Sequence, residues 1–494
     1  MAASSSTAAP PSIPVVFSTK TMYQLPSQRF MVPASWRRFQ LSQLINTALA
    51  LPRVVPFDFL IRGVLLRGSL SEAANSEEET LEIEYIESVL PPSRLATLPH
   101  EEWVSSITCS VPGHFLTGSY DGTLRVFDRA QALLHTAPLH AAPVTSFAIT
   151  PSLPATSDDD LLVVTASHDR TAQISRVSLD GAHSTTSTPL ATLHLHDTPI
   201  ADVASTRDGK YILTAGWDGL IGLWSTSIPE ADEVPLDAVA GPERKKRRKV
   251  QDGGSVKTKA PSAVLRSHTA RVSAVKSPSS GGDAVSCGFD STIRTWDVER
   301  GLCAHTITVS EKPFLALALP TAETTALAAS ADRSVTLFDL RVGATTAAAV
   351  KFPHAATPAA LVFAQSSGTQ FASGAYDGVV RVWDVRSATR EVANARVWEG
   401  QKVLALDWAG ETLGVAGEGG VEIWRAGVGV EGGLQKETSS AGDESTVRPP
   451  PTQQHCLCGF CPTLFVHLLD FLFRGDVRRQ ACSLTLSNNL SSHP

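Results

Sequence analysis

The stretch GSYDGTLRVFD at residues 118–128 returns almost unchanged as GAYDGVVRVWD at residues 374–384. In each copy an Asp-Gly pair, which suits the left-handed backbone of a tight turn, is followed by apolar residues at alternate positions. Each copy therefore predicts the end of one β-strand, a tight turn and a second strand. Repeats of this kind define the architecture of a whole chain, so this stretch decides the fold.

Weaker copies bring the total to seven. They are ASHDRTAQISR (166–176), AGWDGLIGLWS (215–225), CGFDSTIRTWD (287–297), ASADRSVTLFD (329–339) and AGEGGVEIWRA (416–426). The turn acids are Asp121, Asp169, Asp218, Asp290, Asp332, Asp377 and Glu418. Five of the six intervals between these acids measure 41 to 49 residues, and a Trp or Phe follows six residues after every acid except Asp169, where Ser175 stands.

This period and signature resemble the WD-repeat β-propeller, in which each repeat supplies a four-stranded blade. One blade cannot bury its own faces, so we expect the ring of blades to be the folding unit. Residues near Leu95–Leu98 are expected to supply the outer strand of the last blade and close the ring. In WD-repeat proteins a histidine hydrogen-bonds the turn aspartate. The histidines at that position are His100, His140, His196, His268 and His354.

One interval, of 72 residues, is longer than the others because of residues 229–264, which are rich in Pro, Gly and charge. We expect this segment to be a disordered loop leaving the third blade. It contains an unbroken basic run formed by Arg244, Lys245, Lys246, Arg247, Arg248 and Lys249. KKRRKV is similar to the short monopartite nuclear-import signal, while a plain solvated loop and an RNA contact are the alternatives.

The residues upstream of the repeats follow a different pattern. Strands are predicted at PVVFSTK (14–20), QRFMVPAS (28–35), PFDFLIRG (56–63), VLLR (64–67) and LEIEYIE (81–87), and a helix at QLSQLINTALAL (40–51). The order β-β-α-β-β-β resembles the ubiquitin fold. No Gly-Gly terminus follows, so a docking module is expected rather than a conjugated modifier.

We therefore expect a mainly β protein, in which a small α+β ubiquitin-like domain precedes a seven-bladed WD-repeat propeller. The expected boundaries are a disordered N-terminus at 1–13, the ubiquitin-like domain at 14–90, the propeller at 91–427 and a disordered C-terminal tail at 428–494.

The composition limits the function. The chain of 494 residues is 43% hydrophobic and 18% charged with a net charge of −7, which is typical of a soluble globular protein and argues against general electrostatic binding of nucleic acid. The scattered cysteines favour a reducing compartment, and no apolar run approaches the roughly 18 residues of a membrane span. No nucleophile is paired with a base, so we expect no enzyme. We likewise expect no small-molecule substrate, no membrane partner and no cofactor of its own.

A ubiquitin-like domain directly ahead of a seven-bladed propeller is similar to the Notchless-type ribosome-assembly factors, and among them to the Ytm-type WD-repeat ribosome biogenesis factors. The stretches that carry this resemblance are VPFDFLIRGVLLRGSL (55–70), LEIEYIESVLPPS (81–93), EEWVSSI (101–107) and GSYDG (118–122). The resemblance implies a non-catalytic assembly factor for the large (60S) ribosomal subunit, required for pre-rRNA processing and located in the nucleus, in both nucleolus and nucleoplasm.

The resemblance also implies partners. The propeller would bind a block-of-proliferation-type WD-repeat protein, which in turn holds a Pescadillo-type protein on the pre-60S ribosomal particle. The ubiquitin-like domain would dock on the metal site of midasin, an AAA ATPase that releases the factor by ATP hydrolysis. The alternatives are a propeller adaptor of a ubiquitin-ligase pathway and a protein that binds rRNA directly.

In this family one glutamate ahead of the last ubiquitin-like strand completes the coordination of a Mg²⁺ ion held by midasin. In NSEEETLEIEY (75–85), counting back seven residues from Tyr85 gives Glu78 this role, with Glu77 and Glu79 as alternatives in register. A carboxylate oxygen is a natural ligand for this hard cation. Without the resemblance, three adjacent glutamates would indicate only a solvated loop.

Overall fold

The structure is a computed structural model of the chain. It describes residues 11–51, 53–74, 80–88, 91–151, 160–179, 185–234, 256–278, 282–308, 311–320, 324–341, 348–365, 368–387 and 390–427. Glu77 to Glu79, the basic run 244–249 and the expected tail 428–494 lie outside these ranges. Among the described helices, none is long and apolar enough to cross a membrane.

The N-terminal domain has the predicted order of elements, with one short helix added. It consists of β1 (Ser12–Ser18), β2 (Arg29–Pro33), α1 (Arg38–Ala48), β3 (Phe57–Ile61), β4 (Val64–Leu65), α2 (Leu70–Ala73) and β5 (Leu81–Glu87). The sheet order is β2-β1-β5-β3-β4, with β1 and β5 parallel at its centre. Because β1 begins at Ser12, the ordered domain starts two residues before the expected boundary.

The helix α1 covers one face of this sheet because its apolar residues recur at helical spacing. Leu41 and Ile45 are fully buried among Phe57, Phe59 and Tyr85 of the sheet. Strand β3 is buried on both faces, since Leu60 on its other face lies in a small separate cluster with Leu65 and Ile86.

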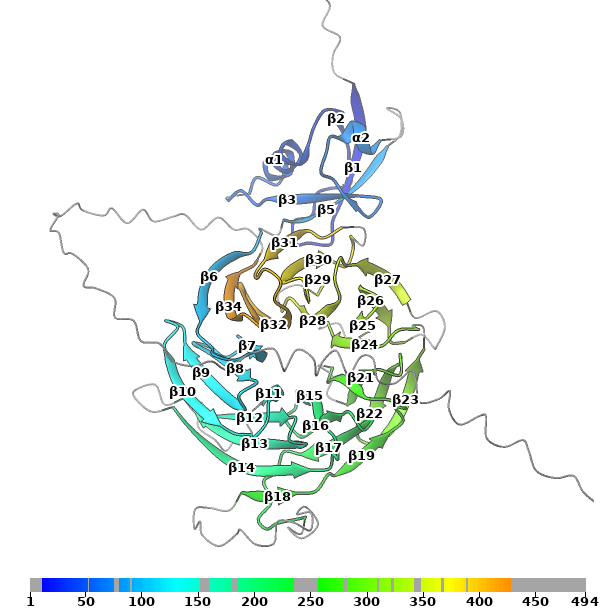
Figure 1. Cartoon of the computed structure of the whole chain (residues 1–494). Helices are drawn as coiled ribbons and strands as arrows, with labels where there is room; N and C mark the ends of the chain where they lie inside the picture. The colour runs from blue at the N-terminus through cyan, green and yellow to red at the C-terminus, as the bar shows by residue number, and fades with distance from the viewer. Residues whose placement is uncertain are drawn as a thin grey trace, which may run out of the picture. The chain divides into compact units, whose positions relative to one another are not determined.

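Seven sheets follow and form a ring of blades (Figure 1). In the first four blades the strands are β7 (Val104–Thr108), β8 (His114–Ser119), β9 (Thr123–Asp128) and β10 (Leu133–Pro138); β11 (Val144–Thr150), β12 (Asp160–Ser167), β13 (Thr171–Ser178) and β14 (Thr186–His194); β15 (Ile200–Ser205), β16 (Tyr211–Gly216), β17 (Leu220–Ser225) and β19 (Ala263–Arg266); β20 (Val272–Lys276), β21 (Asp283–Gly288), β22 (Ile293–Asp297) and β23 (Leu302–Ile307). In the last three they are β24 (Phe314–Ala318), β25 (Thr325–Ser330), β26 (Ser334–Asp339) and β27 (Ala348–Pro353); β28 (Pro358–Phe363), β29 (Gln370–Ala375), β30 (Val379–Asp384) and β31 (Ala393–Arg396); β32 (Val403–Ala409), β33 (Thr412–Gly417), β34 (Gly420–Arg425) and β6 (Ser93–Leu98).

The ring closes as the sequence predicts. Strand β6, which precedes the first blade, pairs antiparallel with β34 as the outer strand of the seventh sheet. Leu98 and Ile423 of that sheet pack in one apolar cluster with Val104 and Phe127 of the first blade. In five blades the Trp or Phe that follows the turn acid is buried in the same way, at most 2% exposed; these residues are Phe127, Trp224, Trp296, Phe338 and Trp383. The blades are therefore stabilised mainly by burial against their neighbours.

The disordered loop predicted at 229–264 extends too far toward its C-terminal end, because two strands begin inside that range. Residues Lys257–Lys259 form β18, which pairs parallel with β14 and adds a fifth strand to the second sheet. Strand β19 begins inside the expected loop as well, at Ala263. The strand β18 is held because Thr258 donates to Asp232 and the buried Lys259 donates to the Ser225 hydroxyl.

Candidate functional site

Six of the blade turns are built around the predicted acids. In the first, second and fourth blades one carboxylate oxygen accepts hydrogen bonds from the N–H and the hydroxyl of the threonine two residues later, as Asp290 does from Thr292 at 3.2 and 2.8 Å. The residue after each aspartate has a left-handed backbone. These residues are Gly122, Arg170, Gly219, Ser291, Arg333 and Gly378, with φ between 59° and 82°. Only three are glycine, so the aspartate rather than glycine is the constant feature of the turn.

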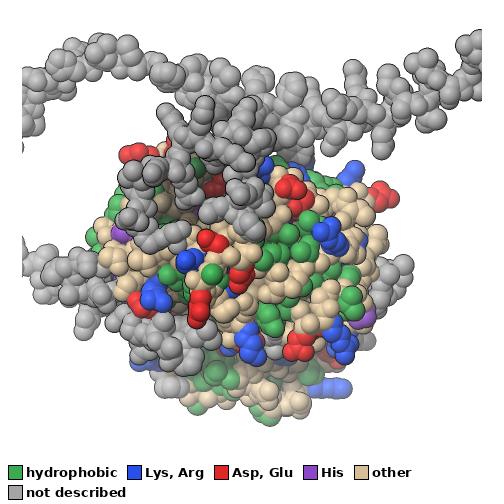
Figure 2. All heavy atoms as spheres, turned by 90° about the horizontal axis from the view of Figure 1, so that it is seen from below, with side chains coloured by type: hydrophobic (Ala, Val, Ile, Leu, Met, Phe, Trp, Pro, Cys, Tyr) green, Lys and Arg blue, Asp and Glu red, His purple; other side chains and the backbone are tan. Residues whose placement is uncertain are grey.

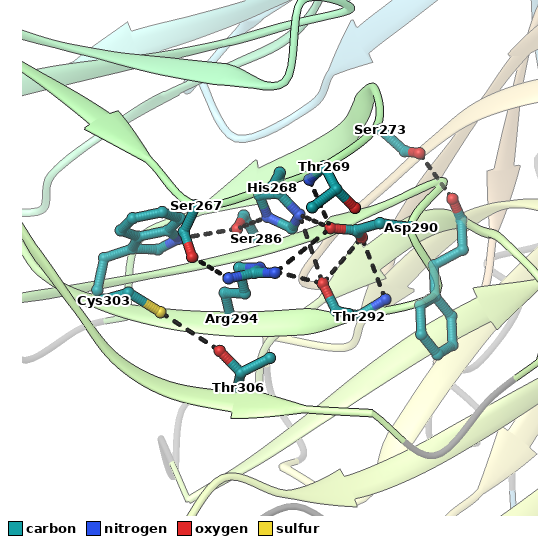
Figure 3. A network of polar contacts seen from close by, with 12 residues as sticks. Ser267, His268, Thr269, Ser273, Ser286, Asp290, Thr292, Arg294, Cys303 and Thr306 are labelled. Atoms are coloured by element: carbon teal, nitrogen blue, oxygen red, sulfur yellow. Dashed lines mark hydrogen bonds and ion pairs between the residues drawn. The ribbon is translucent and has the colours of Figure 1, made fainter.

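In the second, third and fourth blades the predicted histidine does bond the turn acid. The Nδ1 to carboxylate distances are 2.9 Å for His140–Asp169, 3.0 Å for His196–Asp218 and 2.8 Å for His268–Asp290. Figure 3 shows the network of the fourth blade, which connects strands β21 and β22 to the segment before β20. Trp296 Nε1 donates to Ser286 Oγ at 2.8 Å, and Ser286 lies 2.7 Å from His268 Nε2. With its proton on Nδ1, a neutral His268 accepts from Ser286 and donates to Asp290, so every donor in the chain has an acceptor.

Ser286, His268 and Asp290 resemble a catalytic triad in their spacing, but their surroundings give them a structural role. Ser286 is fully buried and its hydroxyl oxygen is already occupied by the Trp296 N–H. The His268 side chain is 0% exposed. A substrate could not reach this hydroxyl without the blade opening, so the network orients the turn and joins the strands of one blade.

The expectation is wrong for His100 and His354. Their Nδ1 atoms face the carbonyl oxygens of Leu98 and Phe352, at 3.2 and 3.0 Å. The acids of these blades are occupied by an arginine four residues later, since Arg125 pairs with Asp121 and Arg381 pairs with Asp377. A guanidinium at 2.5 to 2.7 Å, as here, bonds a carboxylate more strongly than a neutral imidazole does, so the histidine turns away. In the fourth blade the equivalent Arg294 stays 3.6 Å from Asp290, and His268 keeps its bond to the acid.

The fifth and seventh blades depart further. Asp332 pairs with Lys351 of the outer strand at 2.8 Å, in a largely exposed ion pair. The seventh turn is one residue shorter than the others, and Glu418 is not equivalent to the aspartates. The Glu418 N–H donates to the Lys402 carbonyl, just as the Tyr120 N–H donates to the Trp103 carbonyl in the first blade. The Glu418 carboxylate pairs with Lys402 Nζ at 3.2 Å. Glu418 therefore occupies the place of the residue that precedes a turn acid.

The hydrogen bonds of the turns change the ionisation of the acids. Burial disfavours the charged form, but it is outweighed by the hydrogen bonds and charges of His140, His196 and His268 together with the other hydrogen bonds of the turns, so the pKa values of Asp169, Asp218 and Asp290 lie below the ordinary value. Among the described residues, His354 hydrogen-bonds the Phe352 carbonyl and the Ser373 hydroxyl and no carboxylate. Burial is the main cause that lowers its pKa to about 4, while the hydrogen bond with Phe352 acts in the opposite direction.

We predict that His354 makes the protein less stable as the pH falls from about 6.5 to about 4. The folded state holds this imidazole neutral, so the unfolded state binds more protons in that window, and the contribution of His354 is complete only above it. The expected loss is roughly 3 kcal/mol. Urea unfolding at several pH values measures it: His354→Gln should flatten the slope, and His305→Gln, on the exposed face of β23, should not. An unchanged slope in His354→Gln would assign the pH dependence to other groups.

The three candidate glutamates belong to the segment between α2 and β5, whose ends are fixed in the domain. Leu70, at the start of α2, and Leu81, at the start of β5, are at most 2% exposed. Asp58 of β3 is 3% exposed and forms an ion pair of 2.6 Å with Arg38 of α1. The Tyr85 hydroxyl accepts from the Leu25 N–H at 3.0 Å and donates to the Tyr23 carbonyl. The sheet that carries this segment is thus tied to its neighbours by polar contacts as well as by the core.

Comparison with known proteins supports both domains. The profile of the NLE (NUC135) domain matches residues 13–74. That of the WD domain, G-beta repeat, matches residues 92–128, 187–225, 259–297 and 359–384. The chain is 49% identical over 427 residues to the ribosome biogenesis protein YTM1 of Laccaria bicolor, a match covering 84% of this chain and 94% of that protein.

Two further relatives bear the same name. The YTM1 of Coprinopsis cinerea is 50% identical over 448 residues, which cover 87% of this chain and 97% of that protein. The YTM1 of Saccharomyces cerevisiae (strain S288c) is 32% identical over 422 residues, which cover 78% of this chain and 90% of that protein. The chain therefore belongs to the YTM1 family of ribosome biogenesis proteins.

Proposed function

We propose that this chain is a non-catalytic assembly factor of the large ribosomal subunit, required for pre-rRNA processing. The observation that carries the proposal is the pairing of an NLE-type domain with a seven-bladed propeller in one chain, similar to YTM1 proteins over nearly their full length. The buried Ser286–His268–Asp290 network supports a role that depends on shape rather than on chemistry.

The propeller binds a block-of-proliferation-type WD-repeat protein, which holds a Pescadillo-type protein on the pre-60S particle. A closed ring with buried tryptophans and internal hydrogen-bond networks supports this role, because a rigid surface loses little conformational freedom on binding.

The N-terminal domain docks on midasin and contributes Glu78 to a Mg²⁺ ion that midasin holds, with Glu77 and Glu79 as the register alternatives. This chain needs no cofactor of its own for that step. The fixed ends of the segment support the proposal, since a ligand carboxylate must be held in position. ATP hydrolysis by midasin then releases the factor from the particle.

The proposal is tested by purifying the tagged full chain from its own cells and identifying the bound proteins by mass spectrometry. We expect large-subunit proteins, the partner WD-repeat protein and a Pescadillo-type protein, and accumulation of unprocessed pre-rRNA when the chain is depleted. Ubiquitin-ligase subunits in place of pre-60S proteins would favour the adaptor alternative and overturn the proposal.

A direct rRNA contact is supported less well. Figure 2 shows one outer side of the molecule, on which acidic, basic and hydrophobic side chains of the described residues are interspersed. Binding of the phosphate backbone favours a continuous basic surface, and the net charge of −7 opposes it.

The basic run Arg244–Lys249 is proposed as the nuclear-import signal. Replacing Lys245, Lys246, Arg247, Arg248 and Lys249 by Ala should leave a fluorescently tagged protein in the cytoplasm, because the import receptor recognises the clustered charge. Fluorescence microscopy measures the nuclear fraction. Replacing Arg207 and Lys210, two exposed cations in the third blade, is the matched control and should leave the protein nuclear. A nuclear signal unchanged by the first replacement would mean that a partner or another segment carries the protein in.

A further inference from the structure

The residues that follow the second strand of each blade gather at one mouth of the propeller. In every blade the N–H of this residue bonds the carbonyl of the residue that leads into the first strand, at 2.8 to 3.1 Å. The equivalent residues are Tyr120, His168, Trp217, Phe289, Ala331, Tyr376 and Glu418. Five of the seven are aromatic rings or imidazole, although the fold requires only a backbone N–H there.

Several of these rings contact one another around the mouth. The ring centroids of Trp103 and Tyr120 are 5.6 Å apart, those of Tyr120 and His168 are 6.4 Å apart, and those of His168 and Trp217 are 5.5 Å apart. All three pairs meet edge to face. We name Trp103, Tyr120, His168, Trp217, Phe289 and Tyr376 the collar; Tyr376 is 38% exposed and the others are half-buried.

Two cations lie among the collar rings. The Arg271 guanidinium carbon lies 3.3 Å from the ring centroid of Phe289 and 5.3 Å from that of Trp217. Lys402 Nζ lies 5.5 Å from the centroid of Tyr376 and 5.9 Å from that of Trp103. Cation–π contacts of this kind hold a charged group in place and leave its hydrogen atoms free to donate.

The two cations differ in what neutralises them. Lys402 pairs with Glu418 inside the mouth. Among the residues that the structure describes, no carboxylate pairs with Arg271, which is half-buried between its two rings. Burial lowers the pKa of Arg271, so its charge is partly desolvated before any partner arrives. A carboxylate placed here could accept two parallel N–H bonds from the guanidinium in a site of reduced polarity, where such a pair is strong.

We propose that the collar is the docking surface of the propeller for its protein partner, and that an aspartate or glutamate of that partner inserts between the rings to pair with Arg271. The proposal rests on the proposed function and adds the face and the chemistry of the contact. Aromatic residues and arginine are the side chains that most often dominate binding energy at such surfaces.

The charges around the collar favour a protein over RNA. Glu101 and Glu102, which precede Trp103, are exposed, and Asp121, which follows Tyr120, already pairs with Arg125, while Arg170 and Arg333 are exposed in the turns of the second and fifth blades. A single inserted carboxylate can reach Arg271 past such a mixed rim, whereas a chain of phosphates favours a continuous basic surface. The edge-to-face packing also leaves few ring faces open for stacked bases.

The test uses the purified full chain and the purified block-of-proliferation-type partner of the same organism, with the dissociation constant measured by calorimetry. Arg271→Glu should weaken binding by about 30-fold or more, because two carboxylates would then face each other. Tyr376→Ala, at the most exposed ring, should weaken it about tenfold. The matched control is Arg300→Glu, a cation of the same blade that lies in the turn after β22, at the other end of that strand from Asp290, and is 79% exposed; it should leave the affinity unchanged. A cooperative thermal unfolding transition, measured for each variant, shows that the variant is folded.

The outcomes separate the two proposals. If the unmodified chain does not bind the partner, the proposed function of the propeller fails. If it binds, and folded Arg271→Glu and Tyr376→Ala bind equally well, the collar is not the docking surface while the proposed function stands. A fluorescent single-stranded oligouridylate provides the remaining comparison. RNA binding that is lost in Arg271→Glu, with partner affinity retained, would assign the collar to RNA and overturn the inference.

Discussion

A Glu78→Asp variant is expected to bind its WD-repeat partner normally and yet to remain on the pre-60S particle. The change keeps the charge but withdraws the carboxylate by about one C–C bond, or about 1.5 Å. Mg²⁺ requires near-octahedral oxygen ligands at about 2.0–2.1 Å, so a ligand withdrawn by that length leaves the coordination shell. The loss of one charged contact corresponds to about 1.5–3 kcal/mol, or roughly a 10- to 150-fold weaker complex with midasin.

Two measurements check this expectation. Affinity of the purified chain for the metal-binding domain of midasin is measured with Mg²⁺ and with a chelator, and the amount of factor left on pre-60S particles is measured after sedimentation. Glu77→Asp and Glu79→Asp are matched controls, since each removes the same methylene from an adjacent glutamate. A defect confined to one of these controls would move the ligand by one residue. Normal release of all three variants would show that none of the three glutamates is the ligand.

The sequence predicted the architecture because repetition and periodicity report directly on burial. The seven copies of the repeat predicted the number of blades, and the segment at Leu95–Leu98 closes the ring as β6. The helical spacing of Leu41 and Ile45 and the apolar run around Phe57 were enough for the N-terminal domain, because both patterns reflect burial in an apolar core.

The details of the turns could not be predicted in the same way, because they depend on competition between neighbours. Whether a histidine bonds the turn acid depends on how close a neighbouring arginine comes to the carboxylate. Arg125 and Arg381 reach it at 2.5 and 2.7 Å, whereas Arg294 stays 3.6 Å away. Strand β18 forms because Lys257–Lys259 finds the free edge of β14, which no local pattern in a Pro- and Gly-rich segment indicates. The sequence does not predict the collar, because Tyr120, Trp217 and Phe289 each stand at an ordinary position of their own repeat and are brought together only when the ring closes.

Replacing His268 by Phe is expected to destabilise the propeller by about 3–4 kcal/mol, the largest effect of any single blade-turn substitution. The ring keeps the shape of the side chain, but Asp290 loses the donor at 2.8 Å and Ser286 loses the acceptor at 2.7 Å. Arg294, at 3.6 Å from Asp290, is beyond hydrogen-bond distance and does not replace the lost donor. The Asp290 side chain is 4% exposed and stays charged, so water cannot replace the lost bond. The free energy of unfolding in urea, at neutral pH, measures the loss.

His100→Phe is the matched control, because His100 has the same place in its blade but bonds the Leu98 carbonyl instead of the turn acid. Its expected cost is about 1 kcal/mol, since one neutral contact of each nitrogen is lost and Asp121 keeps Arg125. Each change is then combined with Asp→Asn at the turn of the same blade, His268→Phe with Asp290→Asn and His100→Phe with Asp121→Asn. The double-mutant cycle gives the coupling energy between histidine and acid, expected to be about 2 kcal/mol in the fourth blade and close to zero in the first. Equal coupling in both blades would mean that the bond between histidine and acid contributes little, and that packing of the ring alone holds the turn.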